Sequence, residues 1–178
     1  LGLGDSPIED FIMFLNNKIG LDCRGELLGI AGSDEVSGDL TVNLGVVDID
    51  RDSGRAVINI RYPVTFELDQ IMEVIYRAAK EHDIDAEIVG HNPPLYVPKD
   101  DPLVAQLLDI YEEITGQPAD PITTGGGTYA RALDYAVAFG AQFPGGPDLA
   151  HQADEYIDIE ELILHTKIYA HAIARLAK

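Results

Sequence analysis

The stretch LTVNLGVVDIDRDSGRAVINIRYPV, residues 40–64, contains two runs rich in Val and Ile on either side of the polar turn RDSG. β-Branched residues are typical of strands, and a short turn containing Asp and Gly between two such runs indicates a β-hairpin. The stretch therefore predicts two strands, over 40–50 and 55–64, that pair antiparallel and begin a small sheet.

Helical patterns flank this hairpin on both sides. Residues 5–20 and 66–82 carry apolar side chains at the spacing of one helix face. A third strand-like run, DAEIVGHNPPLYVP at 85–98, follows the second helix and ends in prolines. Together these elements predict a layer of helices on a small antiparallel sheet.

The prolines of NPPLYVPKDDP favour an extended backbone, and they predict a domain boundary near Val97. Beyond it, a helix begins after its predicted cap Asp101, a short apolar strand is expected at 135–140, and a last helix begins at Asp158. The alternation of helix and strand indicates an α/β protein. The predicted parts are residues 1–96 and 97–178.

The composition excludes several classes of protein. Twelve basic residues against 31 acidic ones give a net charge of -19, which repels nucleic-acid phosphates and anionic lipid, so neither partner is expected. Cys23 is the only cysteine, so the chain has no internal disulfide and no cysteine-rich zinc site. Without a signal-peptide pattern or an apolar run of about 20 residues, the sequence predicts a cytoplasmic location.

Three features are candidates for a functional site. His151 precedes the last helix, close to the acidic pair DE, and is open to interpretation as a metal ligand, a general base or a surface residue. The chain has no HxH or HxxxH pair, so zinc, which usually takes three protein ligands at a catalytic site, would need partners from distant segments.

The glycine run in TTGGGTYAR, residues 123–131, exposes backbone N–H groups that suit an anion, or else forms a tight turn. Arg61 lies in the apolar run VINIRYPV, where it either pairs with one of the many acids or captures a carboxylate with two hydrogen bonds. From the residues alone both alternatives stay open at each position.

The motifs NIRYPV, GGGTYARAL, AVAFG, FPG and AHQADEYIDIEEL occur in this order. In this combination the chain resembles the C-terminal part of zinc metallopeptidases of the aminoacylase/carboxypeptidase-G type. It is most similar to the peptidase V-like branch of Xaa-His, carnosinase-like dipeptidases. The resemblance covers essentially the whole chain; GGGTYAR and AHQxDEY are its specific part, whereas the first 90 residues match mostly in pattern.

The resemblance implies a catalytic α/β domain with two zinc ions and an inserted lid domain. Residues 1–96 would be the later portion of the lid, and 97–178 the returning end of the catalytic domain. His151 would be the last zinc ligand, and Arg61 would bind the C-terminal carboxylate of a dipeptide substrate. The loop that lines the substrate site would comprise Gly125, Gly126, Gly127 and Thr128.

The motifs that carry the other zinc ligands, the general-base glutamate and a lid histidine are absent from this chain. The resemblance therefore implies a fragment of a zinc-dependent dipeptidase that is inactive alone, contains no catalytic group and associates with itself through truncated faces. The alternatives are a non-catalytic acidic α/β binding module and a related amidohydrolase or tripeptidase.

Overall fold

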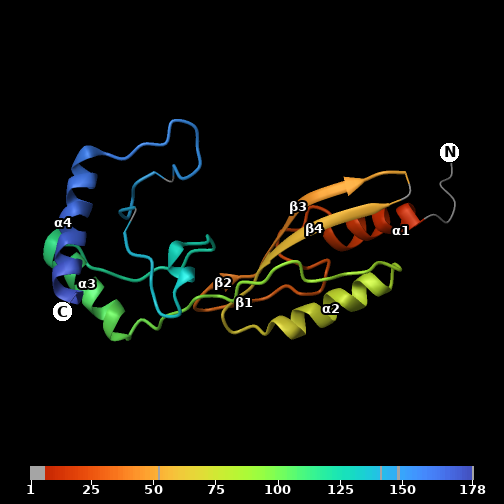
Figure 1. Ribbon diagram of the computed structural model, residues 1–178, viewed down its shortest axis with the longest axis horizontal. Helices are drawn as coiled ribbons and strands as arrows, with labels where there is room; N and C mark the ends of the chain where they lie inside the picture. Colours follow the sequence, from red (N-terminus) through yellow and green to blue (C-terminus); the bar gives the residue numbers. More distant parts are fainter. Residues whose placement is uncertain (1–6, 52, 141, 148, 178) are drawn as a thin grey trace. The chain divides into compact units, whose positions relative to one another are not determined.

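The computed structural model describes residues 7–51, 53–140, 142–147 and 149–177 (Figure 1). Helices and small antiparallel sheets make up the fold, so the predicted α/β class is confirmed. The chain divides into two compact units. The first contains Leu1–Pro94 and Thr123–Gly125, and the second contains Leu95–Ile122 and Gly126–Lys178. The assignment of these parts to a lid and a catalytic domain stays a prediction.

A two-stranded hairpin is the main sheet of the first unit. Strands β3 (Thr41–Ile49) and β4 (Gly54–Arg61) pair antiparallel over their whole length, with an irregularity between Leu44 and Val46. This hairpin is the one that the stretch 40–64 predicts. A second, shorter hairpin joins β1 (Ser33–Asp34) to β2 (Gly38–Asp39).

Two helices complete the first unit. Helix α1 (Pro7–Phe14) continues into a π-helical turn η1 (Leu15–Ile19), and α2 (Leu68–Lys80) follows β4. Apolar side chains from both helices and from the hairpin form one buried core, as predicted for helices layered on a sheet. The buried members include Phe14, Ile19, Leu40, Val42, Ile71, Ile75 and Ala79.

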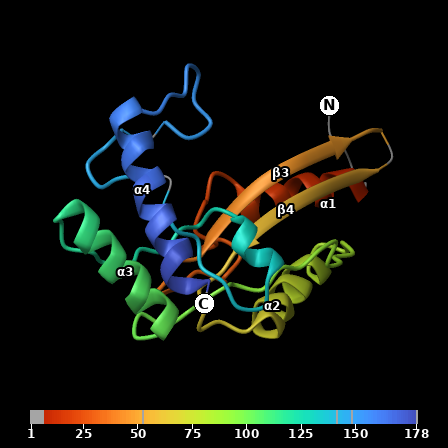
Figure 2. The same ribbon diagram turned by 60° about the vertical axis from the view of Figure 1, so that its left-hand side comes forward.

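The second unit is built around two helices that lie side by side (Figures 1 and 2). Helix α3 (Pro102–Thr115) begins after Asp101, whose side chain accepts a 2.8 Å hydrogen bond from the backbone N–H of Leu103, so this predicted cap is confirmed. Helix α4 (Ile159–Leu176) follows Asp158, whose side chain forms no capping hydrogen bond. Leu107, Ile110, Ile168 and Ala172 form the core between α3 and α4.

Two predicted strands are not formed. The segments predicted as strands, 85–98 and 135–140, pair with no strand of the described chain. None of the backbone N–H and C=O groups of 85–90 and 135–140 bonds to another described backbone group. Between α3 and α4, the described residues form one short helix, η2 (Tyr129–Ala132). A strand exists only through hydrogen bonds to a neighbouring strand, so β-type residues without a partner stay merely extended.

No helix among the described residues is both long and apolar enough to span a bilayer. The cytoplasmic location stays a prediction.

Candidate functional site

Arg61 and Gly125, the first residue of the glycine run, are predicted separately from the sequence and lie in contact within the first unit. Arg61 is the last residue of β4, and its Nη1 donates a hydrogen bond to the carbonyl oxygen of Gly125. A Cβ atom placed on Gly125 would lie 3.7 Å from the same Nη1. The structure therefore brings a guanidinium and the start of the glycine loop to one place.

The surroundings of Arg61 distinguish between its two interpretations. Arg24 pairs with Asp39 at 3.2 Å and Arg77 with Glu73 at 3.1 Å, whereas Arg55 and Arg131, like Arg61, form no ion pair among the described residues. Arg61 forms no ion pair within the described ranges, and its side chain is exposed. A guanidinium has five N–H donors, so most of its donors remain directed to solvent. This arrangement leaves the guanidinium available to an external carboxylate, and it does not show the structural surface pair that was the alternative.

The glycines of the loop are not required by backbone geometry. Neither Gly125 nor Gly127 has a positive φ, and no backbone atom lies within 4 Å of a Cβ placed on either residue. A Cβ on Gly127 would meet open space. The interpretation as a tight turn packed on a neighbouring backbone is therefore not supported at these two positions, and both glycines are exposed.

A titratable pair next to Arg61 was missed by the sequence analysis. The Tyr62 hydroxyl and Nε2 of His91 are 2.6 Å apart, and their rings are nearly parallel, with an interplanar angle of 7°. Burial, followed by the negative charge of Glu67, raises the pKa of the Tyr62 hydroxyl. His91 lies in GHNPP with no motif around it, so only the folded chain reveals this pairing.

His151 is held in an unusual backbone conformation in the second unit. Its φ is 64°, in the left-handed region that a residue with a Cβ adopts at a cost, and its N–H donates to Oε2 of Glu155 at 3.3 Å. The ring is exposed and makes no hydrogen bond to a described residue. A strained backbone that presents a free imidazole is consistent with a ligand or a catalytic role.

The chain by itself does not fit a complete metal site. Within the described ranges, no group of three or more His, Cys, Asp or Glu side chains is close enough to hold a metal ion. A catalytic zinc normally takes three protein ligands. His151 therefore offers one donor, and a complete set of three ligands is not present among these residues.

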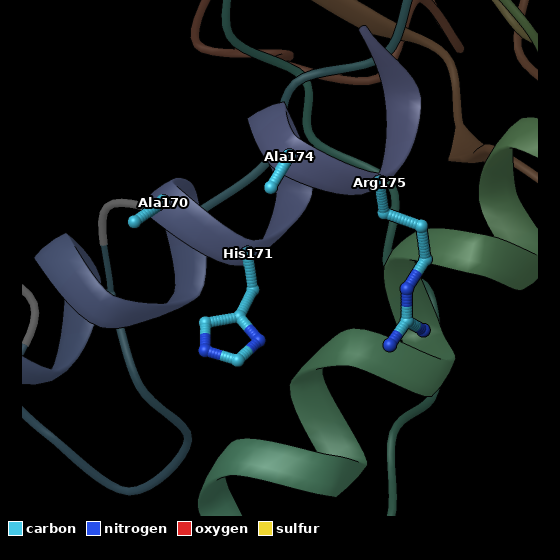
Figure 3. Close-up of a pocket in the computed structure, with 4 residues that line it drawn as sticks. All are labelled: Ala170, His171, Ala174 and Arg175. Atoms are coloured by element: carbon cyan, nitrogen blue, oxygen red, sulfur yellow. The ribbon is translucent and has the colours of Figure 1, made fainter. Parts of the chain in front are cut away.

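A shallow pocket of about 350 Å³ lies on the second unit, away from the predicted site residues. It is lined by Ala170, His171, Ala174 and Arg175, all of α4 (Figure 3). Arg175 forms an ion pair with Glu113 on α3, and the distance between Nη2 of Arg175 and Oε2 of Glu113 is 2.5 Å. Because its cation is already neutralised, this pocket does not resemble a ligand site.

Comparisons with known proteins agree with the resemblance. The model of peptidase family M20/M25/M40 matches residues 10–175. The chain is 44% identical over 175 residues to "Putative dipeptidase YtjP" of Bacillus subtilis (strain 168). The aligned region covers 98% of this chain and 37% of that protein. Proteins also named "Putative dipeptidase" are 39% identical in Staphylococcus haemolyticus (strain JCSC1435) and 38% in Staphylococcus aureus (strain USA300), and each covers at least 94% of this chain.

This chain spans little more than a third of the length of these relatives, 36–37% in the three comparisons. The match of the family model nevertheless extends over nearly all of its residues. The chain belongs to peptidase family M20/M25/M40.

Proposed function

We propose that this chain is the C-terminal part of a dipeptidase and that Arg61 binds the free C-terminal carboxylate of the substrate. The observation that carries the proposal is the exposed guanidinium of Arg61, which has no acidic partner in the described chain and contacts the glycine loop at Gly125. Membership of a peptidase family and the dipeptidase names of the relatives support the reaction class.

In this proposal the loop from Gly125 to Thr128 lines the bound peptide. A carboxylate accepts two parallel hydrogen bonds from a guanidinium, so Arg61 sets the distance between the substrate's C-terminus and the reacting bond. Such a fixed distance selects dipeptides over longer chains, in which the carboxylate lies one or more residues farther away. The exposed backbone N–H groups of the loop are suited to hold peptide oxygens.

We further propose that the intact protein uses zinc and that His151 supplies one of its ligands. A bound zinc would polarise the scissile carbonyl and lower the pKa of a water molecule. The exposed ring of His151, on a residue that adopts the left-handed backbone conformation, supports this role. Because the described residues contain no further group of metal ligands, residues 1–178 alone are expected to be inactive.

The test uses residues 1–178 joined behind the upstream part of the Bacillus subtilis relative, and compares a dipeptide with the same dipeptide carrying a C-terminal amide. The unsubstituted protein should hydrolyse the free acid with a kcat/KM at least about 100-fold higher, a range typical of a charge-assisted contact of about 3 kcal/mol. Arg61→Ala should abolish this preference, while Arg55→Ala, at the other end of β4, should keep it. Equal hydrolysis of acid and amide by the unsubstituted protein would refute the role of Arg61.

The same assay separates the competing activities. Preference for tripeptides or for N-acyl amino acids would identify a tripeptidase or a deacylase, which are the related alternatives. If no peptide is hydrolysed and the joined protein binds no zinc, it is a non-catalytic module.

A further inference from the structure

His151 lies some distance along the chain from the side chains that pack in the core of the second unit. Residues 150–158 are exposed throughout. Before them, Phe143 is the last described residue that packs against the core between α3 and α4, and Leu164 on α4 is the next one after them. The place of His151 therefore depends on how firmly the chain is held at Phe143.

Phe143 lies between the two helices of the second unit. Its ring stacks on His165 of α4, with 4.3 Å between the centroids and 23° between the planes, and its centroid is 6.2 Å from that of Tyr111 on α3. His165 is itself only 5% exposed and stacks on Tyr169, one turn farther along α4. Aromatic pairs in this geometry stabilise a contact beyond the area that they bury, so Phe143 is a specific anchor for the chain around it.

A turn over residues 142–147 determines the course of the chain directly after this anchor. The side-chain Nε2 of Gln142 donates to the carbonyl oxygen of Pro147 at 3.0 Å, and the N–H of Gly146 donates to the carbonyl oxygen of Phe143 at 3.3 Å. The two prolines of the turn restrict φ at their own positions. The turn is therefore stiff, and its direction follows from the position of Phe143.

A second set of local hydrogen bonds holds the backbone at His151 itself. The N–H of Gln152 donates to the carbonyl oxygen of Leu149 at 3.0 Å, and the N–H of His151 donates to Oε2 of Glu155 at 3.3 Å. Residues 142–147 and 149–155 are thus each closed by bonds of their own. Segments closed in this way move together with their anchor rather than independently of it.

We propose that Phe143 is a positioning residue, which holds His151 in place through the turn at 142–147. The inference rests on the proposed role of His151 as a zinc ligand. Without the ring of Phe143, the nearest anchor on this side is Phe139, so a longer part of the chain becomes free to move. Zinc would then bind less tightly, because part of its binding free energy would be used to order the stretch that carries His151.

NMR relaxation tests the anchor in residues 1–178 without any metal. The amide order parameters of 149–155 should be closer to the value of a rigid backbone, about 0.85, than to the range of a flexible one, and Phe143→Ala should lower them below about 0.6. Phe139→Ala is the matched control, because it removes a ring that lies 6.2 Å from Tyr169 in the same aromatic cluster but leaves Phe143 in place. In this control the amides of 149–155 should stay ordered.

Three results of this measurement would overturn the proposal. They are disorder of 149–155 in the unsubstituted chain, unchanged order in Phe143→Ala, and an equal loss of order in Phe143→Ala and Phe139→Ala. The last result would show that Phe143 contributes only to the general stability of the second unit. His165→Ala, which removes the other half of the stack, should lower the same order parameters and decides the question if Phe143→Ala does not fold.

Competition with a chelator measures the consequence for zinc in the joined protein. Phe143→Ala should weaken zinc binding by about 10-fold, the lower end of the range for residues that orient a metal ligand, and Phe139→Ala should weaken it much less. If His151→Ala leaves zinc binding unchanged, the proposed role of His151 is refuted, while the relaxation data still decide whether Phe143 orders this stretch. Weaker binding in His151→Ala together with unchanged binding in Phe143→Ala would refute the positioning role alone.

Discussion

The replacement His165→Leu is expected to stabilise residues 1–178. His165 lies in α4 with 5% of its surface exposed, and neither ring nitrogen has a hydrogen-bond partner in the described structure. Its ring is stacked against Phe143, at 4.3 Å between centroids, and against Tyr169, at 5.7 Å. The histidine therefore occupies an apolar, aromatic place while carrying two polar atoms that the fold does not satisfy.

The expected change in the free energy of unfolding for His165→Leu follows from two opposing contributions. An unsatisfied buried polar group costs about 1–3 kcal/mol, and neutral imidazole has one donor and one acceptor. Leucine removes both and occupies a similar volume, but it forfeits the ring stacking, which contributes about 0.5–1.5 kcal/mol per pair. The difference leaves a net stabilisation of about 1–2 kcal/mol, since the stacking loss offsets only part of the gain.

Urea unfolding at pH 8, followed by circular dichroism, measures this difference. The exposed His171 on the same helix provides the control, because His171→Leu removes no buried polar atom and should change the free energy of unfolding by less than about 0.5 kcal/mol. If His165→Leu lowers the free energy of unfolding by 1 kcal/mol or more, the ring nitrogens have partners and the reasoning is wrong.

Three further predictions concern other parts of the chain. The hydrogen bond from the amide N–H of Ser37 is the main cause that lowers the pKa of Asp34 to about 2. This carboxylate therefore stabilises the fold above about pH 4, and its contribution is lost as the pH falls through 2. Asp34→Asn should reduce the fall in the free energy of unfolding with decreasing pH, measured by urea unfolding at several pH values. Gly140→Ala should lower the free energy of unfolding by about 1–3 kcal/mol, because its Cβ would lie 2.0 Å from the hydroxyl of Tyr169. Gly145→Ala, also at positive φ but in open space, is the control and should lower the free energy of unfolding less. Thermal melts measure both variants, and equal losses would contradict the predicted clash. The exposed apolar side chains of α4 should make the molar mass of residues 1–178 in light scattering rise with concentration, and a constant monomer mass would contradict this.

The sequence predicts those parts of the fold whose interactions are close along the chain. The hairpin of 40–64 and the cap at Asp101 depend on turn chemistry and on neighbours a few residues away, and both are confirmed. The prediction of strands over 85–98 and 135–140 is wrong, although the composition of both segments is typical of strands. Composition describes what a segment can pair with, but a strand also requires a partner.

The sequence singles out Arg61, the glycine run and His151 one by one, but it does not predict the contacts that they make. Arg61 and Gly125 are 64 residues apart, and no periodicity relates a strand end to a loop at that separation. The pairing of His91 with Tyr62 depends in the same way on the folded course of the chain after α2. The left-handed backbone of His151 was not predictable either, because a histidine gives no sequence signal for positive φ as a glycine does.

Both units contain segments whose backbone groups lack partners among the described residues, and both favour the interpretation that residues 1–178 act as part of a longer polypeptide. In the first unit residues 85–90 carry apolar side chains and unpaired backbone groups, and in the second unit residues 135–140 do the same. Unpaired backbone groups cost little while water satisfies them, and they become expensive when a partner buries them without hydrogen bonds. Apolar residues in the same segments favour burial, so the arrangement that satisfies both is pairing with further strands. His151, which belongs to no group of three or more potential metal ligands among the described residues, needs additional donors in the same way. One longer polypeptide would supply both the strands and the donors, which is why the proposed activity is assigned to it and not to residues 1–178 alone.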